Sequence, residues 1–290
     1  MEYVAWEQHP VLRRPVLLAA FEGWNDAGDA ASLAARYLRD LWDAAPVASI
    51  DPEEFYDFST TRPRVRVPDG VHREIVWPAI EITAARVPGA DRDVVFLLAN
   101  EPQLRWRTFC AQVVDIAREL GVELVITMGA LLADVAHSRP VQVIGTASDA
   151  AVVERFGLQR SRYEGPTGIV GVLHDTMDRA GFPTVSLWAG VPAYMPAVPS
   201  PKAALALVER AGALLGTTVP TTGLEIATAS YEREMDAAVE ADDELMAYLA
   251  RLEEMGDDDE DDEDDGVDDT AQPGSLVEEV ERFLRDQRGE

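Results

Sequence analysis

Carboxylate and amide side chains gather in residues 22–31 (EGWNDAGDAA), directly after a short apolar run and directly before a helical pattern. A strand that gives way to a helix brings strand end and helix N-terminus together, and ligands of open α/β sheets bind there. Four side chains of this stretch could hold a cation or a polar ligand: Glu22, Asn25, Asp26 and Asp29. The same groups could instead cap the helix and satisfy its free N–H groups, which is the simpler interpretation.

Three further polar loops follow predicted strands or precede predicted helices, at residues 100–102, 133–140 and 163–168. If all four loops meet at one edge of a sheet, they would line one pocket. Its side chains would include Asn100, Glu101, His137, Arg139, Glu164 and Thr167 together with Trp24, Asn25 and Asp26. An acid–base pair of His137 with Glu164 could then form. Turn formation and helix capping explain most of these residues equally well.

No complete catalytic signature accompanies these loops. The sequence holds no G-x-S-x-G elbow, no P-loop and no G-x-G-x-x-G, and its four histidines lack any short metal-binding spacing. Cys110 lies inside a predicted helix beside Phe109 and Val113, which favours a buried, inert thiol over a nucleophile. We therefore predict no catalytic residue, no metal and no cofactor, and we lean towards a function other than catalysis.

Two tryptophans next to the predicted loops, Trp24 and Trp106, could be exposed anchors for a protein partner. Trp106 has an arginine on each side, and aromatic residues with arginine are the usual composition of interface hot spots. Glu101 could simply pair with one of those arginines.

The elements that position these residues alternate between strand and helix, which predicts an α/β fold with a mostly parallel sheet and helices on both faces. Residues 54–87 instead show short alternating stretches interrupted by prolines, as expected for hairpins or an antiparallel extension of the sheet. The predicted strands are Val16–Gly23, Asp93–Ala99, Glu123–Gly129, Val141–Ala147 and Thr184–Gly190. The predicted helices are Asp26–Trp42, Trp106–Leu120, Ala150–Phe156, Gly168–Ala180 and Pro201–Leu215.

The composition excludes several classes of protein. The formal charge of −28 repels phosphate backbones, so nucleic acid is not an expected partner. No apolar run reaches the roughly 18 residues of a membrane helix, so no membrane is expected either. The first residues lack the pattern of a signal peptide and the chain has one cysteine, which together predict a cytoplasmic protein.

The last quarter of the chain predicts a division into segments. Residues 1–222 should form the α/β core domain, and 223–255 an amphipathic helix whose apolar seam is broken by Asp242. That helix could pack on the core or form an oligomer contact. Residues 256–274 hold an acidic run, with 11 acidic residues in 257–269, and should be a disordered linker. Residues 275–290 predict a short amphipathic terminal helix.

Four strings taken in order resemble the proteasome assembly chaperone family in its bacterial branch: EGWNDAGDAA (22–31), NEPQLRWR (100–107), GALLADVAHSRP (129–140) and YEGPTGIVGVL (163–173). The resemblance covers roughly residues 1–250. It implies a nucleoside phosphorylase-like α/β sheet, homo-oligomers, and protein partners such as proteasome core α or β subunits. Some relatives dock through a C-terminal hydrophobic-tyrosine-any-residue tail. The ending DQRGE of this chain differs, so we do not expect docking of that kind.

Two hypotheses follow. The first is a protein-binding assembly chaperone or scaffold, supported by the resemblance and by the lack of a catalytic signature. The second is a small-molecule-binding enzyme or sensor that uses the polar loops at the strand ends.

Overall fold

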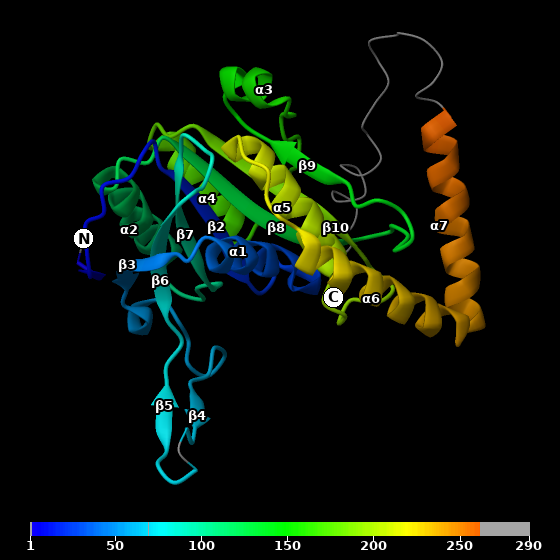
Figure 1. Cartoon of the computed structure of the whole chain (residues 1–290), viewed down its shortest axis with the longest axis horizontal. Helices are drawn as coiled ribbons and strands as arrows, with labels where there is room; N and C mark the ends of the chain where they lie inside the picture. Colours follow the sequence, from blue (N-terminus) through cyan, green and yellow to red (C-terminus); the bar gives the residue numbers. More distant parts are fainter. Residues whose placement is uncertain (1, 69, 262–290) are drawn as a thin grey trace.

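The computed structural model describes residues 2–68 and 70–261 (Figure 1). An eight-stranded sheet has the order β1-β3-β6-β7-β2-β8-β10-β9. Its central strands β7, β2, β8 and β10 are parallel, and antiparallel strands flank them on both sides. The strands are β1 (Val4–Trp6), β2 (Val16–Glu22), β3 (Ala45–Ile50), β6 (Ile80–Arg86), β7 (Asp93–Asn100), β8 (Leu124–Ala133), β9 (Val143–Thr146) and β10 (Thr184–Pro192). The predicted α/β class with an antiparallel extension is confirmed.

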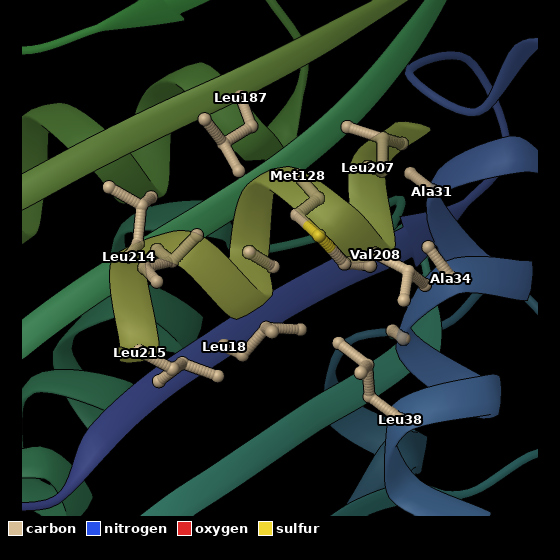
Figure 2. Packing of buried hydrophobic residues seen from close by; sticks show 14 of the residues in the cluster. Leu18, Ala31, Ala34, Leu38, Met128, Leu187, Leu207, Val208, Leu214 and Leu215 are labelled. Carbon is tan, nitrogen blue, oxygen red and sulfur yellow. The ribbon is translucent and has the colours of Figure 1, made fainter. Parts of the chain in front are cut away.

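Helices cover both faces of the sheet, as predicted. On one face α1 (Ala30–Leu41) packs against α5 (Pro201–Leu215), and Figure 2 shows their side chains meeting Leu18, Met128 and Leu187 of the strands. On the other face lie α2 (Trp106–Glu119) and α4 (Ile169–Arg179). The short helix α3 (Ala150–Phe156) follows β9.

Burial on both faces explains why β2 is an unbroken apolar run. Val16, Leu18 and Ala20 belong to the core beneath α1 and α5. Leu17, Ala19 and Phe21 belong to the core beneath α2 and α4. A parallel strand in the middle of such a sheet has no polar face, so its sequence cannot alternate. The polar residues at the strand ends are therefore attached to strands that are packed on both faces.

The C-terminal helical segment is divided, where the sequence pattern predicted one helix. Helix α6 spans Thr222–Glu240, and α7 spans Asp243–Asp261. Asp242, predicted as a break in an apolar seam, begins the second helix: its Oδ1 accepts hydrogen bonds from the backbone N–H groups of Glu244 (2.9 Å) and Leu245 (3.2 Å). Helix α7 ends inside the segment predicted as a disordered linker. The rest of that linker and the predicted terminal helix lie outside the described residues.

A two-stranded hairpin projects from the body of the molecule (Figure 1). It pairs β4 (Arg64–Arg66) with β5 (Glu74–Val76) in an antiparallel sheet separate from the main one. We call residues 62–77 the arm. The prediction of hairpins within residues 54–87 is confirmed.

Candidate functional site

Glu22 and Asn100 lie opposite each other at the ends of the parallel strands β2 and β7. The Asn100 Nδ2 group donates a hydrogen bond to Glu22 Oε2 at 2.9 Å, and Arg36 of α1 forms an ion pair with Glu22 Oε1. The Glu22 carboxylate therefore fastens β2 to its neighbouring strand and to α1. The structure brings these predicted site residues together, in contacts that hold the elements in place.

Glu101 connects the end of β7 to the beginning of α4. Its Oε1 accepts a hydrogen bond from the backbone N–H of Ile169 at 2.9 Å, the first residue of that helix. Its own backbone N–H donates to the Glu22 carbonyl at 2.8 Å. A carboxylate at a helix N-terminus satisfies a free donor and opposes the helix dipole. Glu101 thus caps α4, and among the described residues it forms no ion pair with an arginine.

Asp26 and Asp29, predicted either as ligands or as caps, have different surroundings. Asp26 is buried, and its Oδ1 accepts hydrogen bonds from the N–H groups of Ala31 (2.7 Å) and Ser32 (3.0 Å) at the beginning of α1. Burial raises the pKa of Asp26 above its ordinary value, although these hydrogen bonds oppose the shift. Asp29 is exposed and makes no side-chain capping bond. Of these two aspartates, only Asp26 fits the capping interpretation.

Asn25 is buried beside the beginning of α4. Its carbonyl accepts a hydrogen bond from the Ala130 N–H at 2.8 Å, which joins the β2 loop to β8. Its side-chain Oδ1 is shielded from solvent and has no hydrogen-bond partner among the described residues. This oxygen lies so near Gly168 that a Cβ atom there would come within 2.0 Å of it. Only glycine at position 168 lets the loop and the helix approach this closely.

His137 and Arg139 lie elsewhere, contrary to the prediction of one shared pocket. The buried His137 ring has its Nδ1 2.6 Å from the Tyr194 hydroxyl and its Nε2 3.0 Å from Asp236 Oδ1 of α6. Arg139 Nη2 donates to the Glu253 carbonyl of α7 at 2.8 Å. These two side chains bind the C-terminal helices to the core. The possible acid–base pair of His137 with Glu164 is not formed, and Glu164 is exposed in the loop before α4.

A cavity of about 680 Å³ lies near the carboxyl ends of β2, β8 and β10. Trp24, Asn25 and Thr167 line it, whereas the other predicted site residues do not: Glu22, Asp26, Asp29, Asn100, Glu101, Trp106, His137, Arg139 and Glu164. Tyr163 belongs to the predicted loop 163–168, but sequence reasoning missed most of the lining, which includes Ile144, Gln159, Arg160, His174 and Trp188. No local signal marked these residues, because Trp188 sits within an apolar strand, and Ile144, the pair Gln159 and Arg160, and His174 lie in three separate parts of the chain.

The two predicted tryptophan anchors differ in exposure. Trp24 is 48% exposed at the cavity. Trp106 is only partly exposed, and its indole N–H donates to the Pro102 carbonyl. The neighbouring Arg105 forms an ion pair with Glu54 and lies over the ring of Tyr3, 5.0 Å from its centroid. Of the two, Trp24 presents the larger free surface.

The thiol of Cys110 is buried in α2, and burial raises its pKa to about 12. A thiol with so high a pKa carries almost no thiolate at neutral pH and is no nucleophile. Across residues 2–68 and 70–261, no three histidine, cysteine or carboxylate side chains are grouped as a metal ion would need.

Comparison with known proteins gives a family and close structural relatives. The model of the PAC2 family matches residues 20–239. A Mycobacterium tuberculosis proteasome-assembly chaperone homologue is 47% identical and superposes with a TM-score of 0.74, covering 81% of this chain and 99% of its own. A PAC2 family protein from Streptomyces avermitilis is 43% identical with the same coverage and TM-score. A second M. tuberculosis protein, of unknown function, is 29% identical with a TM-score of 0.84, covering 98% of this chain and 96% of its own.

No curated protein matches the chain. The matched span includes all four strings on which the resemblance was based, and it covers most of the α/β domain. The chain belongs to the PAC2 family.

Proposed function

We propose that this chain is a protein-binding assembly chaperone or scaffold that acts on proteasome core subunits or a related complex. Membership of the PAC2 family supports this, as does the 47% identity to a protein that is itself described as a proteasome-assembly chaperone homologue. The polar residues at the strand ends are occupied in capping and in joining elements, so they support a structural role more than a catalytic one.

The observation that carries the proposal is the exposed apolar surface of the arm. Val65 is 48% exposed, Ile75 50% and Trp77 55%, although each of them is an apolar side chain in or beside a strand. Phe58 packs edge-on against Trp77, 4.8 Å between ring centroids, and about half of each of the three side chains stays open to solvent. Exposed apolar residues on a projecting element support an interaction site there. Two-stranded hairpins are marginally stable in isolation, so a partner would stabilise the arm as well.

Charge gives the arm a preference among partners. Residues 62–77 contain four arginines and two acidic residues, whereas the whole chain carries 53 acidic and 25 basic residues. An apolar surface with arginines suits a partner surface that is apolar in its centre and acidic at its rim. At the base of the arm a hollow of about 600 Å³, lined by Tyr3, Trp77 and Pro78 among others, offers space for a partner side chain.

The test uses purified, unassembled proteasome α and β subunits mixed with the full chain, with complex formation measured by size-exclusion chromatography and light scattering. The double variant Val65→Ser/Ile75→Ser should lose most of the complex. Val11→Ser is the matched control, because Val11 is 88% exposed but lies outside the arm. A wild-type chain that forms no complex with either subunit type, or arm variants that bind like the control, would contradict the proposal.

Homo-oligomer formation stays a prediction, and the same measurement on the chain alone tests it. If the arm variants change the mass of the free chain, the arm joins copies of this chain. If they change only the mixed complex, it contacts the other subunit. The cytoplasmic location is likewise a proposal. In the described part of the chain no helix combines the length and the apolar character needed to span a membrane.

A second docking element is proposed at the C-terminal end of the sequence. We propose that residues 275–290, which lie outside the described residues, take part in docking, and their amphipathic sequence pattern supports this. Removing residues 262–290 should then weaken binding of the same purified subunits. Unchanged affinity after this deletion would exclude residues 262–290 from the mechanism.

A further inference from the structure

The cavity near the ends of β2, β8 and β10 has walls that are mainly apolar and aromatic. Trp24, Tyr163 and Trp188 contribute rings, and Ile144 and Leu131 contribute aliphatic surface. Its volume of about 680 Å³ falls in the range of sites for small organic molecules, roughly 300–1,000 Å³. Side chains of this kind, around a concave site at the strand ends of an α/β sheet, favour a ligand with an apolar ring.

One wall depends on a close contact between two strands. Trp188 of β10 lies directly opposite Gly129 of β8, and a Cβ atom at position 129 would come within 2.5 Å of the indole ring. The ring can therefore lie over the β8 backbone only because residue 129 is glycine. The Trp188 indole N–H donates to Ser186 Oγ at 2.9 Å, and Ser186 Oγ also accepts from Thr127 Oγ1 at 3.0 Å. These bonds fix the orientation of the ring.

Two polar atoms of the lining residues have no hydrogen-bond partner among the described residues. They are Asn25 Oδ1 and His174 Nδ1, and both are shielded from solvent. Burial lowers the pKa of His174 even though Asp178 and Asp175 oppose the shift, so the imidazole is neutral near pH 7. Both atoms therefore lie behind the surface that a ligand in the cavity would contact.

Charge in the lining has one sign. Among the described residues that line the cavity, Arg160 is the only one with a formal charge at neutral pH, and no carboxylate lines it. This is unusual in a chain with 53 acidic residues. Arg160 is exposed in the loop before α4, where no ion pair with a described carboxylate holds it. An anionic group of a ligand could therefore meet a free guanidinium.

We infer that this cavity is a binding site for a small planar aromatic molecule that carries one anionic group. The ring of the molecule lies against Trp24 and Trp188. The anionic group meets Arg160. This site is separate from the arm, so it adds a small-molecule ligand to a protein that we propose to bind other proteins.

The test uses three naphthalene compounds that share a ring and differ in charge: 2-naphthoate, 2-naphthalenemethanol and 2-naphthylmethylamine. Affinity is measured by isothermal titration calorimetry on the full chain. We expect the carboxylate to bind best and the amine to bind least, because the only formal charge in the lining is positive. Absence of binding by all three compounds, or equal affinity for the carboxylate and the amine, would overturn the inference.

The position of the bound compound is determined from the indole N–H signals of the six tryptophans in ¹H–¹⁵N spectra. These signals are assigned with Trp→Phe variants. With the carboxylate bound, two signals should shift, those of Trp24 and Trp188. The remaining four should stay in place: Trp6, Trp42, Trp77 and Trp106. Shifts confined to the second group would place the compound outside the cavity and contradict the inference.

Two variants from the same loop complete the test. Arg160→Gln should weaken binding of the carboxylate by roughly two- to fivefold, the range for a solvent-exposed ion pair, and leave binding of the alcohol unchanged. Arg162→Gln is the matched control, because Arg162 is exposed two residues away and does not line the cavity. Equal effects of the two substitutions on the carboxylate would refute the role of Arg160.

Discussion

Substitution of Glu101 can distinguish helix capping from ligand binding as the role of the polar residues at the strand ends. Loss of a capping carboxylate lowers the free energy of unfolding, whereas loss of a ligand-binding carboxylate need not. Glu101 Oε1 accepts from the Ile169 N–H at 2.9 Å. Replacing it with alanine removes a capping bond worth about 1 kcal/mol and a favourable helix-dipole interaction worth about 0.5 kcal/mol. We therefore expect Glu101→Ala to lower the free energy of unfolding by about 1.5 kcal/mol. Glu101→Gln, which keeps the acceptor, should lower it by only about 0.5 kcal/mol.

The assay is equilibrium unfolding in urea, followed by far-ultraviolet circular dichroism. Glu164→Ala is the control, because Glu164 is exposed in the loop before the same helix and should change the free energy by no more than about 0.5 kcal/mol. If Glu101→Ala unfolds like the wild type, the hydrogen bond does not stabilise α4. If the glutamine variant is as unstable as the alanine variant, the charge and not the acceptor carries the effect. Either result would refute the capping argument.

Three further predictions concern stability and reactivity. Asp93 is buried, and burial would raise its pKa, but the Arg13 side chain and backbone N–H overcome this and hold the pKa below its ordinary value. The ionised Asp93 carboxylate should stabilise the folded state fully above about pH 4, and this stabilisation should disappear as the pH falls further. Asp93→Asn should therefore flatten the acid part of a curve of unfolding free energy against pH. Cys110 should not react with a thiol reagent at pH 8 until the chain unfolds, because its pKa is about 12; rapid labelling of the native protein would contradict this. Asp236→Ala should speed limited proteolysis of α6 and α7 and lower the free energy of unfolding by about 1 kcal/mol, since it removes one of the two partners of the buried His137 ring. Glu240→Ala, an exposed change in the same helix, should have no such effect.

The parts of the fold that sequence reasoning predicted are those with a strong local pattern. The run Val16–Glu22 is apolar throughout because both of its faces are buried, and α1 and α2 show clear helical spacing. Strands β1 and β3 were not predicted. β1 has three residues, and β3 contains Pro46 and small side chains, so their extended conformation depends on pairing with each other and with β6.

The candidate site was predicted only in part, because its composition depends on distant contacts. The loops after β2 and before α4 do meet, through Asn25 and Gly168, as strand-end placement suggested. His137 was expected in the same pocket, but its partner Asp236 lies 99 residues further along the chain. Nothing local in the sequence distinguishes a histidine that faces a cavity from one that contacts a distant helix, as His137 contacts α6. The lining by Trp188 and His174 was missed for the same reason.

The structural uses of the polar strand-end residues explain why the cavity beside them is lined without carboxylates. Glu22, Asp26 and Glu101 are engaged in holding β2, α1 and α4, so the carboxylates of this edge are withdrawn from the cavity. What remains in the lining is aromatic surface, neutral hydrogen-bonding groups and Arg160. Because Gly171 and His174 of α4 line the cavity, a ligand there would contact the same helix that Glu101 caps. Loss of that cap should therefore weaken binding of the aromatic carboxylate as well as stability. An intact affinity in Glu101→Ala would show that α4 keeps its position without the cap.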